Sequence, residues 1–483
     1  MAHLKKIQNW MKANNIDLFL LNRTDEFNNE YIAPYAERLK WLSDFSGSAG
    51  KLIIDLKKGR IFVDGRYTLQ VKQEVDKNLF KISKLENYWK LFERNLSKKI
   101  TLAIDPKLHS TLEILKIIKI IKKKKSEIIY LNNNPIDKIW KNQPTYPISL
   151  AFIHPNKYSG KSTKEKILKI QSILKRNSIN FYLLTSLDSI AWLLNIRGND
   201  IKYTPLILSY AIIPSKGKVE FFIQNKKIKL IKNKLNKFVN FRAFNNIPTF
   251  LKNLKKSDVI GIDPKKTNYF LFKICESENL PIKYFEDPCT YPKAQKNFTE
   301  LSGARRSNIR DGVSLTKFIF WLKNKMIIRK TDEIKAAKYL EKLRKKNKFF
   351  YSLSFSTISA IGRNAALPHY KLTQKSNTPF KKNKIYLFDS GSQYLDGTTD
   401  ITRTIILGKP TKEQKDRFTR VLKGHISLAI AEFSIYSKGS SLDSIARKSL
   451  KEIKCDYDHG TGHGIGSFLS VHEGPQRISK MKY

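Results

Sequence analysis

The stretch YLFDSGSQYLDGTTDITRTIIL at residues 386–407 decides the fold of the C-terminal part of the chain. Apolar and polar residues alternate along both halves, which is the pattern of half-buried strands. The Asp396-Gly397 pair interrupts the alternation and predicts a β-hairpin turn. Asp389 and Asp400 lie on the two arms, 400 − 389 = 11 positions apart, so both side chains can point to one face of the sheet.

Two carboxylates that face each other across a hairpin repel unless a positive charge lies between them. Cross-strand neighbours are only about 4.5–5.5 Å apart at Cβ. One or two divalent cations would remove the repulsion, because hard oxygen ligands suit Mg, Mn or Zn. The alternative is a solvated turn with two acidic caps. The apolar neighbours of Asp389 and a histidine downstream favour the metal site.

That histidine belongs to a glycine-rich segment, DHGTGHGIGSFLSVHEGP at residues 458–475. His459, His463 and His472 all lie within it, although the chain has only 8 histidines. Its glycines would let the backbone approach a ligand or metal closely. We expect one metal ligand and one or two imidazoles that face substrate or support that ligand. His369, in AALPHYKLT, is a further candidate that is equally compatible with an ordinary structural position.

The segments around the hairpin predict an α+β region with antiparallel strands at its centre. Residues 300–322 have helical periodicity, Thr331-Asp332-Glu333 resembles the start of a second helix that runs to about residue 350, and a third helix is expected over 412–433. The apolar stripe expected to be buried in the first helix consists of Val313, Leu315, Phe318, Ile319 and Leu322.

The N-terminal part of the chain contains an internal repeat. Segments 15–66 and 177–223 each show an apolar strand, a Trp-Leu helix that ends in glycine, and two alternating strands joined by a Lys-Gly turn. We expect two copies of one α/β unit. The first copy ends near Tyr146-Pro147, and the second extends from Ile148 to the loop around Pro288-Cys289.

Composition limits the class of protein. The chain has 483 residues, with 91 Lys+Arg against 42 Asp+Glu and a net charge of +49. A hydrophobic content of 41% excludes a wholly disordered chain, and the length predicts two to four domains. No run of about 18 apolar residues is present, which excludes a spanning helix. The three cysteines are too scattered for a disulfide framework. These features predict a cytoplasmic protein that does not bind membranes.

The positive charge is spread along the whole chain and no nucleic-acid-binding motif accompanies it, so we expect no nucleic-acid partner. The densest basic run, Lys122 to Lys125, closes the stretch ILKIIKIIKKKK. It is compatible with a helix that binds a membrane surface or phosphate. The favoured interpretation is an amphipathic helix with a buried face and a lysine-rich end.

Several motifs together resemble one family. FDSG at 388–391, DGTTDITRT at 396–404 and HGTGHGIGSFLSVHEGP at 459–475 resemble the pita-bread metallopeptidases, in particular the Xaa-Pro aminopeptidases in their three-domain cytosolic form. The resemblance covers essentially the whole chain. Further matching stretches lie at 30–50, 63–70, 193–213, 304–322 and 355–370.

The resemblance implies a fold and an activity. The fold is α+β, with creatinase-like α/β domains at 1–147 and 148–292 and a pita-bread catalytic domain at 293–483. The activity is release of the N-terminal residue from short peptides with proline at the second position, by a hydroxide that bridges two metal ions, typically manganese. A homodimer is expected. Asp389, Asp400 and His463 match metal ligands, whereas His369, His459 and His472 match residues that contact substrate and stabilise the tetrahedral intermediate.

Two glutamate ligands of the family are missing from this sequence. They lie in TDEPG-like and RIEN-like motifs beyond HEGP, but the sequence ends 483 − 475 = 8 residues after Pro475. The resemblance therefore implies a fragment with an incomplete catalytic domain that is inactive by itself; a catalytically dead protein is the alternative. Other functions compatible with the fold are an Xaa-Pro dipeptidase, a creatinase-like amidinohydrolase, which needs no metal, and a non-catalytic module that binds peptides or histones.

Overall fold

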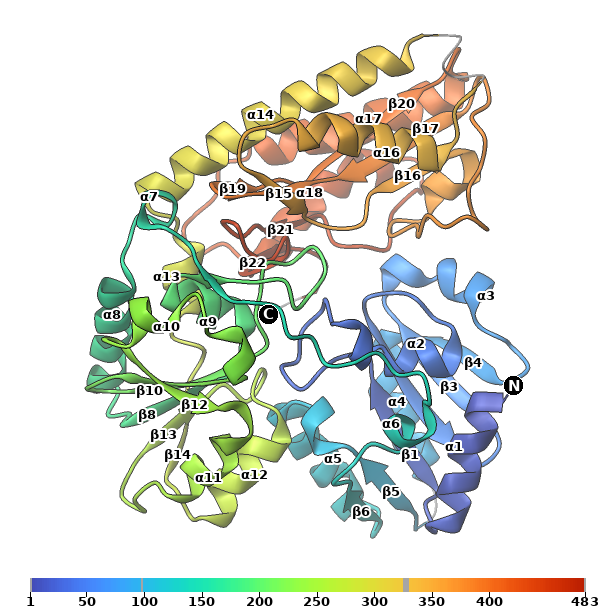
Figure 1. Cartoon of the computed structure of the whole chain (residues 1–483). Helices are drawn as coiled ribbons and strands as arrows, with labels where there is room; N and C mark the ends of the chain where they lie inside the picture. The colour runs from blue at the N-terminus through green and yellow to red at the C-terminus, as the bar shows by residue number, and fades with distance from the viewer. Residues whose placement is uncertain (1, 97–98, 325–329, 482–483) are drawn as a thin grey trace. The chain divides into compact units, whose positions relative to one another are not determined.

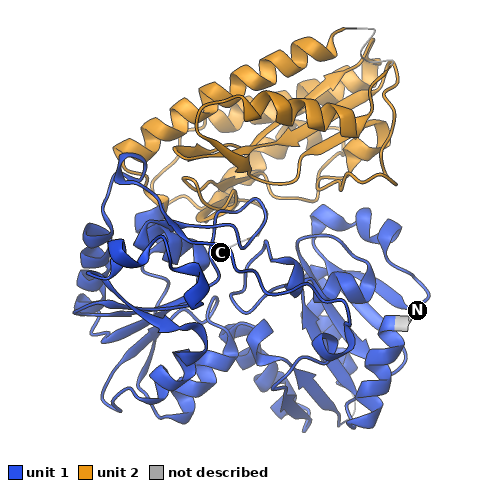
Figure 2. Cartoon of the chain, in the orientation of Figure 1, with its two compact units in different colours: residues 1–293 blue, residues 294–483 orange. Residues whose placement is uncertain are grey.

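The chain folds as two units, unit 1 with residues 1–293 and unit 2 with residues 294–483 (Figure 2). The computed structural model describes residues 2–96, 99–324 and 330–481. Every helix in these ranges is too short or too polar to span a lipid bilayer.

The first sheet of unit 1 has six strands in the order β4-β3-β2-β1-β5-β6 (Figure 1). β1 pairs antiparallel with β2 and parallel with β5. Side chains of these strands, such as Phe19, Ile54 and Ile61, are fully buried. The strands are β1 Leu18–Asn22, β2 Gly50–Asp55, β3 Gly59–Val63, β4 Phe80–Lys84, β5 Thr101–Ile104 and β6 Glu127–Tyr130. The helices are α1 Ala2–Ala13, α2 Arg38–Ser43, α3 Gln70–Glu74, α4 Tyr88–Asn95, α5 Thr111–Lys123 and α6 Pro135–Ile139.

The second sheet of unit 1 repeats the first. Its order is β12-β11-β10-β8-β13-β14, with β8 antiparallel to β10 and parallel to β13. Position by position, the order and direction of its strands match those of the first sheet, which confirms the predicted duplication. The strands are β8 Phe181–Leu184, β10 Tyr210–Pro214, β11 Val219–Ile223, β12 Val239–Ala243, β13 Ile260–Ile262 and β14 Ile282–Tyr284, with a separate pair β7 Phe152–Ile153 and β9 Ile196–Arg197. The helices are α7 Asn156–Ser159, α8 Thr163–Arg176, α9 Leu187–Leu194, α10 Lys232–Leu235, α11 Ile247–Lys252, α12 Tyr269–Ser277 and α13 Thr290–Ala294.

The basic run at the end of α5 belongs to an amphipathic helix, as predicted. The Ser110 side chain accepts a hydrogen bond from the backbone N–H of Glu113 and caps the helix. Ile114 and Ile117 are fully buried, while Lys122 and Lys123 occupy the last turn. Cations there interact favourably with the partial negative charge of the helix C-terminus.

Unit 2 places two helices, α14 and α16, on one face of the three-stranded sheet β16-β17-β20 (Figure 1). Leu315 and Phe318 of α14 and Leu340 of α16 pack against Tyr386 and Phe388 of β17. The helices are α14 Phe298–Leu322, α16 Glu333–Lys345, α17 Lys412–Ala429 and α18 Gly439–Lys451. The strands are β15 Phe350–Leu353, β16 Ile358–Ile361, β17 Ile385–Ser390, β18 Ser392–Tyr394, β19 Gly397–Thr398, β20 Ile401–Ile406, β21 Gly462–Gly464 and β22 Glu473–Ile478.

Two details differ from the prediction. Val313 is 49% exposed, because only the side of α14 that carries Leu315, Phe318 and Leu322 faces the sheet. The hairpin turn consists of Leu395 and Asp396, since Gly397 already pairs with Tyr394.

The glycine at this pairing position has a packing role. A Cβ atom on Gly397 would lie 2.4 Å from Ser307 Oγ of α14, so a side chain there would push the hairpin away from the helix.

Phe318→Ala tests whether the α14 face holds unit 2 together. We expect the free energy of unfolding to fall by about 3–5 kcal/mol, because a large buried ring is replaced by a cavity. Phe320→Ala is the matched control on the same helix, since Phe318 is 0% exposed and Phe320 is 79% exposed. Urea unfolding followed by circular dichroism measures both variants. Equal losses would contradict the assigned core.

Candidate active site

Asp389 lies near the end of β17, where its position in the β17–β20 ladder fixes the direction of its side chain. It pairs with Thr402 of β20, and Asp400 comes two residues before Thr402. Because alternate residues of a strand share one face, Asp389 and Asp400 meet on the same side of the sheet. The predicted convergence of the two hairpin carboxylates is therefore present.

The surroundings of Asp389 disfavour its ionised form. Burial and the negative charge of Asp400 raise the pKa of Asp389 to about 6, while the Thr402 hydroxyl and His463 act in the opposite direction. A hydrogen bond between the two carboxyl groups also contributes to the raised pKa, because it requires a proton on one of them. In addition, Asp389 Oδ1 is buried and has no hydrogen-bond partner among the described residues.

Three imidazoles lie beside these carboxylates. His463 Nε2 is 3.4 Å from Asp400 Oδ2. The ring of His472 is 4.4 Å from that of His463 and 6.5 Å from that of His369, between centroids. The fold thus brings His369 close to the downstream histidines, although it lies far from them in the sequence.

His459 is placed differently. Its Nδ1 lies 2.8 Å from the Gly460 carbonyl oxygen, and its ring is 4.7 Å from that of Tyr457. The side chain is exposed. These contacts are all within its own segment, so the geometry supports His459 less directly than the other three histidines.

The glycines of the 458–475 segment allow β21 and β22 to approach closely. A Cβ atom on Gly464 would lie 2.5 Å from the Glu473 carbonyl oxygen, and one on Gly466 would lie 2.7 Å from that of Ser470. The contact of Gly464 belongs to the β21–β22 pairing that presents His463. Close approach of this backbone to a ligand or metal stays a prediction.

Sequence reasoning missed a buried ion pair behind the site. Arg344 of α16 donates to both oxygens of Asp311 on α14 at 2.9 and 2.7 Å, and both side chains are 0% exposed. Arg344 also donates to the carbonyl oxygen of Ser390, next to Asp389, at 3.3 Å. One signal in the sequence could have indicated this pair. Asp311 lies four positions before Leu315, so it falls on the same helix face as the apolar stripe and is expected to be buried with it.

Two further contacts anchor the histidine segment. Lys296 forms an ion pair with Glu473, the neighbour of His472. Gln393 of β18 donates from Nε2 to the Leu469 carbonyl oxygen at 2.7 Å. The segment is therefore tied both to the chain before α14 and to the hairpin that carries the aspartates.

The donor set suits a divalent cation. His463 Nε2 and Asp400 Oδ2 lie 3.4 Å apart, so one ion could contact both atoms. The orphaned Asp389 Oδ1 is an available oxygen ligand. Among the described residues, no group of three or more His, Cys, Asp or Glu side chains is already arranged to hold a metal ion.

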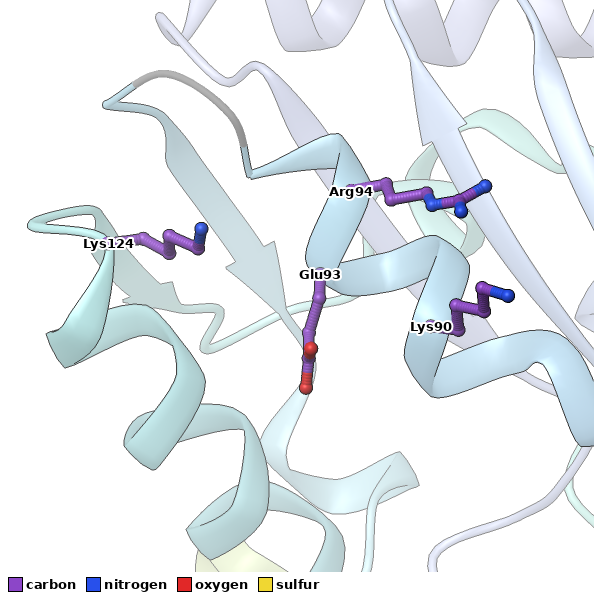
Figure 3. A pocket seen from close by; sticks show the side chains of 4 residues that line it. All are labelled: Lys90, Glu93, Arg94 and Lys124. Atoms are coloured by element: carbon purple, nitrogen blue, oxygen red, sulfur yellow. The ribbon is translucent and has the colours of Figure 1, made fainter.

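A shallow pocket in unit 1 offers no comparable chemistry. It is lined by Lys90, Glu93 and Arg94 of α4 and by Lys124 at the end of α5 (Figure 3). The side chains of Lys90 and Arg94 point away from Lys124, so the cations do not converge on one ligand position.

Comparison with known proteins agrees with this geometry. Residues 3–129 and 142–300 match the family described as Creatinase/Prolidase N-terminal domain, and residues 302–483 match Metallopeptidase family M24. The chain is 37% identical to the "Probable Xaa-Pro aminopeptidase P" of Paracoccidioides brasiliensis strain Pb03, over 98% of this chain and 80% of that protein. The chain belongs to the Xaa-Pro aminopeptidases of family M24. Its fold is the two creatinase-like domains and the pita-bread domain that the sequence predicted.

Other members of family M24 extend the comparison. The Xaa-Pro aminopeptidase 1 of Dictyostelium discoideum is 36% identical over 99% of this chain and 78% of its own length. The crystal structure of an X-prolyl aminopeptidase from Caenorhabditis elegans, described as a cytosolic enzyme with a di-nuclear active site, superposes with a TM-score of 0.91. That protein is 33% identical to this M24 member, and the match covers 96% of this chain and 77% of that one.

Arg344→Met tests the ion pair that supports β17. We expect the free energy of unfolding to fall by about 3–5 kcal/mol, because Asp311 would remain buried without its cation. Arg403→Met, on an exposed position of β20, is the control and should change stability by less than about 0.5 kcal/mol. Urea titration of both variants provides the comparison. A loss below about 1 kcal/mol for Arg344→Met would show that the pair does not stabilise unit 2.

Proposed function

We propose that this protein is a metal-dependent aminopeptidase that releases the N-terminal residue from short peptides with proline at the second position. The observation that carries the proposal is the convergence of Asp389, Asp400 and His463, with one buried carboxylate oxygen left without a partner. The names of the relatives that match nearly the whole chain support the same substrate class.

In this proposal Asp389, Asp400 and His463 hold two divalent cations, manganese by preference. The di-nuclear site described for the Caenorhabditis elegans protein supports the number of ions. Bound cations of this kind lower the pKa of water and polarise a carbonyl group. Asp389 and Asp400 supply the negative charge that retains them, and the burial around Asp389 strengthens the attraction.

The remaining histidines act on the peptide. His369 and His472 are close enough to line one side of the same space, and imidazole N–H groups there would hydrogen-bond the oxygen that becomes negative in the transition state. His459 is assigned to the same group on family resemblance alone. Proline lacks a backbone N–H and has a fixed φ, so a site that recognises its shape accepts peptides that other peptidases reject.

The wider assignments are also proposals. We assign the domains to residues 1–147, 148–292 and 293–483, a division that the matched ranges 3–129, 142–300 and 302–483 support. We assign the protein to the cytoplasm and expect a homodimer; the description of the Caenorhabditis elegans relative as cytosolic supports the location.

Metal binding by these 483 residues is the first test. Titration with Mn²⁺, followed by calorimetry, should show binding that Asp389→Asn weakens by at least about 10–100-fold, the loss caused by removing even an outer partner of a metal ligand. Asp76→Asn, at an exposed position, is the matched control. His463→Ala should behave like Asp389→Asn, and His425→Ala, on an exposed position of α17, should bind normally. An unchanged affinity for Mn²⁺ in both Asp389→Asn and His463→Ala would contradict the assignment of these residues as metal ligands.

Activity is the second test. The protein should release arginine from Arg-Pro-Pro in the presence of Mn²⁺ and lose this activity on chelation, because the cations would activate the attacking water. Cleavage of Xaa-Pro dipeptides only would identify a dipeptidase. An intact tripeptide with Mn²⁺ bound would indicate a binding module and contradict the proposal.

A further inference from the structure

Glu333 is a fully buried carboxylate that lies outside the metal cluster. It is the first residue of α16 and is 0% exposed. It does not cap its own helix through its side chain, because Asp332 does so by accepting a hydrogen bond from the Lys335 backbone N–H. Its carboxylate is therefore available for other contacts.

Those contacts are hydrogen bonds from four uncharged groups. Oε1 accepts from the Ile361 backbone N–H at 2.7 Å and from Asn364 Nδ2 at 3.0 Å. Oε2 accepts from the Tyr370 hydroxyl at 2.9 Å and from the Thr378 backbone N–H at 3.0 Å. A single carboxylate thus joins the end of β16, two points inside the loop that follows, and the point where that loop returns to α16.

This loop, residues 361–378, carries His369. Within the loop, Leu367 and Tyr370 lie on either side of His369 in the sequence and pack against Ile358 and Ala360 of β16. Tyr370 donates a hydrogen bond to Glu333 and directly follows His369. The carboxylate therefore restricts the backbone at His369, whose imidazole extends toward His472.

We propose that Glu333 is a positioning residue that holds the 361–378 loop so that His369 faces the active site. The inference rests on the proposed function, which gives His369 its role toward substrate. Only a carboxylate suits this position, because ionised Glu offers acceptors on both oxygens. Glutamine would turn an NH₂ donor toward at least one of the donors that now point at Glu333.

Glu333→Gln tests the proposal on the chain as it stands. Lys371 and Lys375 are exposed in the loop, so the rate of tryptic cleavage there reports how often the loop opens. We expect an increase of at least about tenfold, because hydrogen bonds to an ionised group are lost. Glu341→Gln, at the partly exposed Glu341 of the same helix, is the matched control and should be cleaved at the wild-type rate.

Two further measurements guard against loss of folding. Tyr370→Phe removes one donor but keeps the packed ring, so it should raise cleavage less than Glu333→Gln does. The imidazole resonances of His369, assigned with His369→Ala, should shift or broaden in Glu333→Gln while those of His425 stay unchanged. Wild-type cleavage and an unchanged His369 spectrum in Glu333→Gln would overturn the proposal.

Measurements of kcat distinguish a residue that acts by positioning His369 from one that only stabilises the fold. In peptidase assays with Mn²⁺, Glu333→Gln and His369→Ala should each lower kcat for Arg-Pro-Pro, and the double variant should be no slower than His369→Ala. Multiplicative losses would overturn the positioning role. If no variant or wild-type protein cleaves the peptide, the proposed function fails, whereas the proteolysis and the spectrum still decide whether Glu333 holds the loop.

Discussion

Repulsion between the carboxylates of Asp389 and Asp400 is the constraint on which unit 2 depends. The register of β17 and β20 brings the two groups together, and the surrounding residues remove much of the water that would screen them. Such an arrangement is stable only when a proton or a cation lies between the groups. The fold therefore favours binding of a positive charge between these two carboxylates. His463 lies 3.4 Å from Asp400 and can contact the same charge.

The rest of the unit keeps that arrangement from relaxing. The rings of Phe318 and Phe388 lock α14 onto β17, at 5.1 Å between centroids. Arg344 links α16, α14 and the end of β17 through Asp311 and Ser390. Because both sets of contacts hold β17, moving Asp389 away from Asp400 would break packing and buried hydrogen bonds together.

Local patterns in the sequence were sufficient for the elements and for the residues that converge. Alternation predicted the hairpin, helical spacing predicted α14, and the clustering of histidines identified His463 and His472. Contacts between distant segments were not predictable, because nothing local distinguishes Arg344 or Glu333 from the exposed charges that surround them in sequence. The close approach of Gly464 to Glu473 in the pairing of β21 with β22 was likewise not predicted, because it depends on how the segment folds back on itself.

Three buried carboxylates of unit 2 show how structural and functional groups differ. Asp311 is paired with Arg344 and also accepts from the Tyr394 hydroxyl at 2.8 Å. Glu333 is satisfied by neutral donors on both oxygens. Asp389 alone of these three keeps an oxygen without a partner and faces a second carboxylate. An unsatisfied buried acceptor costs roughly 1–3 kcal/mol, and a cation bound to Asp389 would offset that cost, which distinguishes this carboxylate from the two that protein groups already satisfy.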